Sequence, residues 1–144
     1  MKKGFTLMEL IIVVVIIGIL AMVGLPQFFR VAERGRAAEG IALLGSIRNA
    51  QLRFAAERGA TTANVGDLDI NVPAAAQLRF FGAPVLTAGV NPETQPASVI
   101  ATVQRTATQN QAGNNYTLSI QANGVFQCAG GLATTCQIVR PREN

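Results

Sequence analysis

The sequence contains no histidine and no tryptophan, and its only lysines are Lys2 and Lys3. Histidine is the commonest general base and the commonest metal ligand, so its absence removes the usual starting point for an active site or a metal centre. No phosphate-binding loop and no pairing of a nucleophile with a base stands out. We therefore predict that the protein is not an enzyme and that it holds no cofactor and no metal.

The sequence does contain one long apolar run, residues 5–25, which is interrupted only by Thr6 and Glu9. At 1.5 Å per residue, a helix of this length measures about 30 Å, which is the thickness of a bilayer's hydrocarbon core. Lipid favours a helix even in a run rich in valine and isoleucine, because every backbone polar group must be paired within the segment. Lys2 and Lys3 precede the run, and the positive-inside rule keeps that side in the cytoplasm. We predict a membrane-spanning helix.

Glu9 is the unusual residue of this run. A carboxylate within a spanning helix is costly to insert, so an acid at such a position is expected to have a function. A secretory signal peptide would place its cleavage site after the apolar run, but residues 21–24 match that pattern poorly. The small residue Gly4 precedes the run instead. Cleavage between Gly4 and Phe5 would make Glu9 the fifth residue of the mature chain, close to a new α-amino group.

These residues resemble the leader and N-terminal helix of type IV pilins and pseudopilins. The resemblance covers residues 1–30 and rests on Gly4, Phe5, Thr6, Leu7, Glu9, Leu10, Gly18 and Pro26. It implies that a prepilin peptidase removes the leader, residues 1–4, and methylates the new amine of Phe5. The alternative is an ordinary single-pass anchor with an isolated acid.

The resemblance also implies how the mature helix, with its hydrophobic half at residues 5–26, assembles. Glu9 would lie near the Phe5 amine of a neighbouring copy, where a buried carboxylate costs much less than it does alone. The pair would then fix the position of each subunit in a helical filament. Alternatively, Glu9 serves only recognition by the processing enzyme. Three residues weaken the helix, and the resemblance implies that the segment containing them can lose helical structure in the filament: Gly18, Gly24 and Pro26.

Residues 27–58 are predicted to continue the helix in amphipathic form. Apolar residues at spacings of three and four form a stripe that is expected to pack on a sheet: Ile41, Leu43, Leu44, Ile47, Ala50 and Phe54. The opposite face is charged: Arg30, Glu33, Arg34, Arg36, Glu39, Arg48, Arg53, Glu57 and Arg58. These charges form either a solvated face or contacts to neighbouring subunits.

Three glycines lie within this half of the helix, and a fourth follows its last residue. Gly59 is expected to end it with a left-handed cap. Gly35, Gly40 and Gly45 are interpreted either as points of close approach or as tolerated flexibility.

Residues 59–96 predict a long connection with one short element near residues 74–81. An oxygen-rich cluster within it could suggest calcium: Asn64, Asp67, Asp69 and Asn71. The cluster lacks the glycine and the glutamate that an EF-hand loop needs at fixed positions. Asx caps and turns explain it better.

Residues 97–144 predict a small antiparallel sheet. Strands are expected at residues 98–103, 115–121 and 125–128, the last two joined by a hairpin at Asn123-Gly124, with 137–139 as a final edge.

Cys128 and Cys136 follow the hairpin, on the side of the membrane away from the cytoplasm, where a disulfide between them is expected. The predicted fold class is α+β, with a long N-terminal helix packed against a small antiparallel sheet. The resemblance identifies this arrangement as the pilin fold.

Together these features predict a structural subunit of a type IV pilus. The chain would first span the inner membrane, surrounded by lipid, and an inner-membrane assembly platform would then add it to an extracellular filament of copies of itself. A pseudopilin of a type II secretion system, in a periplasmic pseudopilus, is the alternative. The formal charge of +4 falls to about +2 without Lys2 and Lys3, which gives no basis for nucleic-acid binding. Adhesion, twitching motility and DNA uptake are not distinguished.

Overall fold

The computed structural model describes residues 4–106, 115–130 and 136. The chain divides into two compact units, one ending at Glu33 and the other beginning at Arg34. One helix, α1 (Leu7–Arg58), contributes to both units. It begins two residues later than predicted and ends where predicted. The helix continues through Pro26, so the loss of helical structure in the filament stays a prediction.

Gly59 ends α1 as its sequence position predicted. Its φ of 84° lies in the left-handed region, which glycine adopts without a Cβ penalty. Its amide donates a hydrogen bond of 2.7 Å to the carbonyl of Ala55. This bond pairs one of the carbonyls that a helix end otherwise leaves open.

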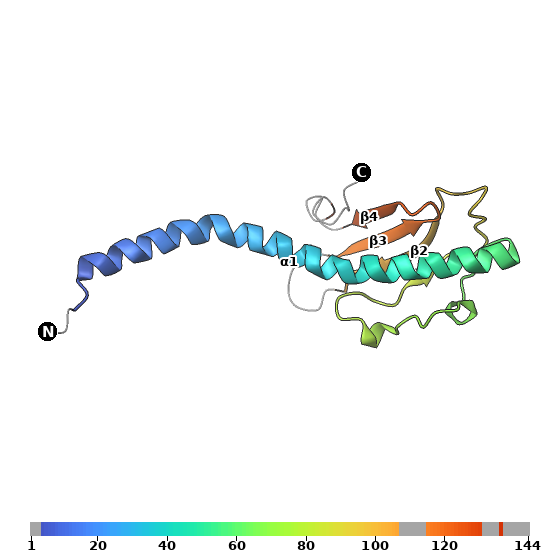
Figure 1. Cartoon of the computed structure of the whole chain (residues 1–144), viewed down its shortest axis with the longest axis horizontal. Coiled ribbons are helices and arrows are strands. Elements are labelled where there is room, and N and C mark those ends of the chain that lie inside the picture. Colours follow the sequence, from blue (N-terminus) through green and yellow to red (C-terminus); the bar gives the residue numbers. More distant parts are fainter. Residues whose placement is uncertain (1–3, 107–114, 131–135, 137–144) are drawn as a thin grey trace. The chain divides into compact units, whose positions relative to one another are not determined.

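The second unit contains one antiparallel sheet in the order β1-β2-β3-β4 (Figure 1). Its strands are β1 (Val85–Leu86), β2 (Val99–Gln104), β3 (Tyr116–Gln121) and β4 (Phe126–Gly130). Three of them confirm the predicted strands to within two residues at each end, and the turn at Asn123-Gly124 joins β3 to β4. The short strand β1 was not predicted. The predicted edge at 137–139 lies outside the described residues.

The connection before the sheet contains two short 3-10 helices, η1 (Val65–Asp67) and η2 (Ala75–Gln77). The second falls within the single element that the sequence predicted near residues 74–81. After η2, Phe81 forms an isolated β-bridge with Arg105 just beyond β2. This bridge holds the connection at Phe81 against the edge of the sheet.

The core of this unit lies between the second half of α1 and one face of the sheet (Figure 1). The predicted stripe supplies the helix side, where Leu44 and Ile47 are fully buried. The strand β3 alternates buried and half-buried residues, with Tyr116, Leu118 and Ile120 facing the core. The apolar residues at every second position of β3 and those at spacings of three and four in α1 pack together in one apolar layer.

Gly40 is a point of close approach between α1 and Phe81. A Cβ at this position would lie 2.9 Å from Cζ of Phe81, a ring that is 1% exposed and packs edge-on against Tyr116. Gly35 and Gly45 have no side-chain atoms from elsewhere in the described chain within 4 Å of such a Cβ. Of the three glycines, only Gly40 is thus required by the packing within this unit.

A buried amide fixes the chain where it leaves α1. The side chain of Gln51 is completely buried, donates to the carbonyl of Thr62 at 2.6 Å and accepts from the Thr62 amide at 3.0 Å. A buried backbone group without a partner costs about 1–3 kcal/mol, so this pair stabilises the return of the chain along the helix.

Candidate functional site

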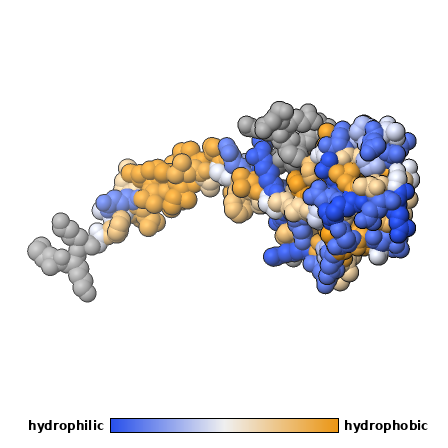
Figure 2. Space-filling view, turned by 45° about the vertical axis from the view of Figure 1, so that its right-hand side comes forward, coloured by the Kyte–Doolittle hydropathy of each residue, from blue (hydrophilic) through white to orange (hydrophobic). Residues whose placement is uncertain are grey.

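In the first unit, every large apolar side chain that the structure describes is exposed. Those from Phe5 to Val31 have exposed fractions between 49% and 86%. Figure 2 shows a broad hydrophobic surface along much of this part of the helix, on the face in view. An 18-residue window of α1 has a mean hydropathy of 2.9, so by length and composition this helix is able to cross a membrane. A surface of this size in water is unfavourable, and it requires lipid or protein cover.

The residues at the predicted cleavage site lie just before this surface. Gly4 and Phe5 have no regular secondary structure, and the Phe5 side chain is 86% exposed. The remaining leader residues, 1–3, lie outside the described residues. Gly18 and Gly24 lie within α1, with no side chain from elsewhere in the described chain near either of them.

Glu9 is held by a capping box at the start of α1. Its carboxylate accepts hydrogen bonds from the amide of Thr6 at 3.0 Å and from the Thr6 hydroxyl at 2.8 Å. The Thr6 hydroxyl also accepts from the amide of Glu9 at 3.3 Å. Thr6-Leu7-Met8-Glu9 has the spacing of this motif, a signal that the sequence prediction did not use. Glu9 thus has a partner within its own chain.

Several charges of the predicted solvated face of α1 bind other parts of the same unit. Both carboxylate oxygens of Glu39 accept backbone amides, from Arg79 and Phe80, each at 2.9 Å. Arg48 donates to the carbonyl of Ala122 at 2.9 Å. Neither interpretation of this face, as solvated or as contacting other subunits, foresaw these contacts. They tie the connection and the β3–β4 turn to the helix.

Arg53 and Asp69 form a two-pronged ion pair across the same helix face. Two guanidinium nitrogens of Arg53 each lie 2.6 Å from a carboxylate oxygen of Asp69. This hydrogen bonding lowers the pKa of Asp69 and raises the pKa of Arg53. The contribution of Asp69 to stability is therefore present above its unfolded pKa, and it is lost as the pH falls through the lower folded value. Both side chains are more than half exposed, so the effect is small.

Two other residues of the oxygen-rich cluster, Asn64 and Asp67, form hydrogen bonds at η1. The Asn64 side chain accepts from the amide of Gly66 at 3.0 Å, and Thr62 donates its hydroxyl to Asp67 at 2.8 Å. The Asn64 contact confirms the interpretation of that residue as an Asx cap, whereas Asp69 instead forms the ion pair with Arg53. Among the described residues, no group of three or more His, Cys, Asp or Glu side chains is arranged to hold a metal ion.

A disulfide joins Cys128 in β4 to Cys136, with 5.5 Å between their Cα atoms. This separation is typical of protein disulfides. The bridge ties the chain beyond β4 back to that strand, as the sequence predicted. Removing such a bridge from a small secreted domain costs about 2–5 kcal/mol.

Comparisons with known proteins match both units. Residues 1–25 match the family model described as "Prokaryotic N-terminal methylation motif", and residues 34–141 match "Pilin (bacterial filament)". The chain is 32% identical to the type IV major pilin protein PilA of Myxococcus xanthus over 147 residues, which covers 83% of this chain and 66% of that protein. It is 48% identical over 48 residues to the type IV major fimbrial protein FimA of Dichelobacter nodosus, 33% of this chain and 30% of that protein. No solved structure matches the chain.

Proposed function

This chain belongs to the bacterial pilin family, and on that basis we propose that it is the structural subunit of a type IV pilus. The chain spans just under two thirds of the length of the Myxococcus protein and less than a third of the Dichelobacter protein. One observation carries the proposal more than any other: the first half of α1 presents an apolar surface that no other part of the described chain covers. Lipid covers this surface first, and other copies cover it after assembly.

The first step of the proposed pathway frees the N-terminus. A prepilin peptidase cuts between Gly4 and Phe5 and methylates the Phe5 amine, in keeping with the match of residues 1–25 to the methylation motif. The chain then rests in the inner membrane through α1. An inner-membrane assembly platform moves it into the filament, and the mature pilus lies outside the cell. Nothing in this pathway requires a catalytic group in the chain itself.

Glu9 acts at the second step, when a subunit docks. Its carboxylate pairs with the methylated Phe5 amine of a neighbouring copy, and a subunit docked at the wrong height leaves that amine unpaired in an apolar surrounding. The capping box with Thr6 gives the carboxylate two hydrogen bonds before assembly. The box therefore lowers the cost of carrying the acid in lipid until the partner arrives. Helix weakening near Gly18, Gly24 and Pro26 would let the apolar half adjust to its neighbours.

Electron microscopy of material sheared from the native host tests the proposed function. Long surface filaments that bind antibody against this chain are expected in the wild type, and deletion of the gene should abolish them. Filaments that persist without the gene would contradict the proposal. The pseudopilin alternative predicts no long surface filaments at native expression levels. The relatives above carry pilin and fimbrial names, which favours the pilus.

A further inference from the structure

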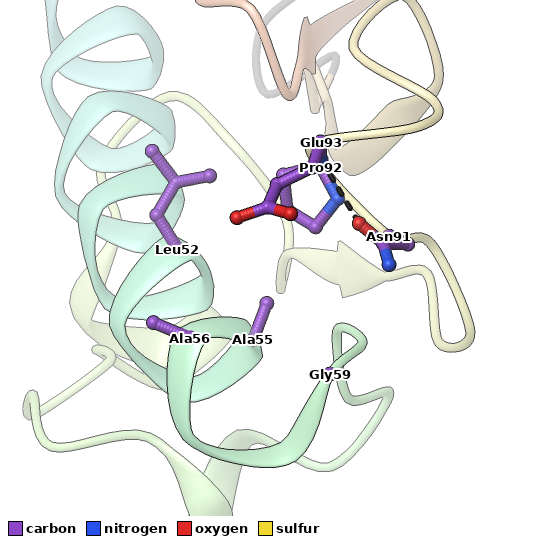
Figure 3. Close-up of a pocket in the computed structure, with 7 residues that line it drawn as sticks. All are labelled: Leu52, Ala55, Ala56, Gly59, Asn91, Pro92 and Glu93. Atoms are coloured by element: carbon purple, nitrogen blue, oxygen red, sulfur yellow. Dashed lines mark hydrogen bonds between the residues drawn. The ribbon is translucent and has the colours of Figure 1, made fainter.

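A surface pocket of about 370 Å³ lies beside the last turns of α1 (Figure 3). Leu52, Ala55 and Ala56 form its helix side, and Pro92 and Glu93 form the opposite side. Figure 3 shows the Glu93 carboxylate directed across the opening toward the helix. The pocket therefore combines an apolar floor with one acidic group at its mouth.

The wall that carries Glu93 is held in place. The side-chain oxygen of Asn91 accepts from the Glu93 amide at 2.9 Å, and the backbone carbonyl of Asn91 accepts from the Gln95 amide at 2.8 Å. Val90, next to Asn91, is buried in the core and bonds through its carbonyl to the amide of Thr61 at 2.9 Å. The pocket is thus preformed, so a partner pays little ordering entropy to use it.

The electrostatics of the pocket favour a cation. The carbonyl end of α1 carries a partial negative charge, and Glu93 adds a full one. Within the described residues, the Glu93 carboxylate makes no hydrogen bond and no ion pair. An arginine with an apolar neighbour in the sequence could pair with the Glu93 carboxylate while the neighbour packs on the apolar floor, which is formed by Leu52, Ala55 and Ala56.

The chain itself offers one such segment. Arg30 is the only arginine of the described residues whose side chain makes no hydrogen bond, ion pair or ring contact. Phe29 precedes it, with 56% of its side chain exposed. Arg30 belongs to the first unit and the pocket to the second, and we consider a contact between two copies of the chain.

We propose that the pocket receives Phe29 and Arg30 of a second copy, with Phe29 on the apolar floor and Arg30 paired with Glu93. The inference rests on the proposed function and adds a specific contact to it. The contact joins the second unit of one subunit (Arg34–Asn144, called the head) to the helix of another, and it adds to the contacts between apolar helix surfaces. Because the pocket and the inserting segment are different surfaces, the contact is head-to-tail and repeats along a filament instead of closing a dimer.

Charge exchange in the native host tests this contact. Arg30→Glu and Glu93→Arg are each expected to lower the filament yield, measured as sheared over total pilin, about tenfold or more, because each places like charges together. The double variant Arg30→Glu with Glu93→Arg should recover most of the wild-type yield. Glu57 is the matched control, because it is a nearby exposed acid outside the pocket: Glu57→Arg should not rescue Arg30→Glu. Normal yield in both single variants, or equal rescue by Glu57→Arg, would overturn the inference.

Cross-linking gives a second measurement that leaves both charges in place. The variant with Phe29→Cys and Pro92→Cys should form a ladder of covalent oligomers when intact filaments are mildly oxidised. Phe29→Cys with Val85→Cys, at the exposed position of strand β1, should stay monomeric. Filaments of the first variant that give no ladder contradict the contact. A wild-type chain that forms no filaments at all contradicts the proposed function instead, so the two failures are distinguishable.

Discussion

A Glu9→Gln variant is expected to be cleaved and inserted like the wild type and yet to yield at least about tenfold less filament. Glutamine keeps the capping box, because its side-chain oxygen still accepts from the amide and hydroxyl of Thr6. It removes only the negative charge that would meet the Phe5 amine of the neighbour. The variant leaves the Phe5 amine of the neighbour buried without its partner, and an unpaired buried charge is strongly destabilising. This destabilisation should affect filament assembly and not the folding of the subunit. Quantitative immunoblots of sheared and membrane fractions measure this yield.

Two further variants separate the possible roles of Glu9. Thr6→Val removes the two hydrogen bonds of the Thr6 hydroxyl from the capping box and keeps the acid, so its filament yield should fall much less than that of Glu9→Gln. If Glu9 serves only the processing enzyme, Glu9→Ala should leave the leader attached, which a shift in gel mobility would detect. Normal filament yield from Glu9→Gln would rule out the charge pairing.

Gly40→Leu should be among the most damaging single changes in the head. A side chain at this position must displace the buried ring of Phe81, and removing such a ring from a core costs about 3–5 kcal/mol. Leucine regains about 1 kcal/mol in helix propensity over glycine, so the net loss should be about 2–4 kcal/mol. The unfolding midpoint of the full chain in detergent, followed by circular dichroism, should fall by about 8 °C or more.

Gly45→Leu is the matched control on the same helix. No atom from elsewhere in the described chain lies within 4 Å of a Cβ at Gly45, so leucine gains helix propensity there without a steric cost. The unfolding midpoint of this variant should therefore stay unchanged or rise slightly. Equal midpoints for Gly40→Leu and Gly45→Leu would contradict the close approach of Phe81.

The regular elements could be predicted because each depends on local patterns. The end of α1 at Gly59 and the hairpin at Asn123-Gly124 follow from residues that adopt special backbone conformations. The core stripe and the inward face of β3 follow from periodicity. The strand β1 could not be found this way, since two residues show no alternation and its pairing with β2 is set by the tertiary fold.

Some residues of the candidate sites could also be identified from local sequence patterns, and others depend on the tertiary fold. The resemblance identified Gly4, Phe5 and Glu9 as candidate site residues. The capping box of Thr6 and Glu9 is also present in the sequence as a spacing, but it lies within the apolar run that predicts a membrane span. Gly40 and Gly45 look alike in the sequence, and only the position of Phe81 separates them. The binding of Arg48 and Arg53 within the head, and the pocket at Glu93, both depend on loops whose paths no local pattern determines.

The central claim is that the mature chain begins at a newly freed Phe5 and that the apolar half of its helix α1 is buried among other copies in the filament. The intact mass of the protein in purified sheared filaments tests it most directly. The mass should correspond to a chain that lacks Met1 to Gly4 and carries one methyl group, with fragmentation placing that group on the Phe5 amine. Filaments built from chains that still carry Met1 to Gly4 would contradict the claim.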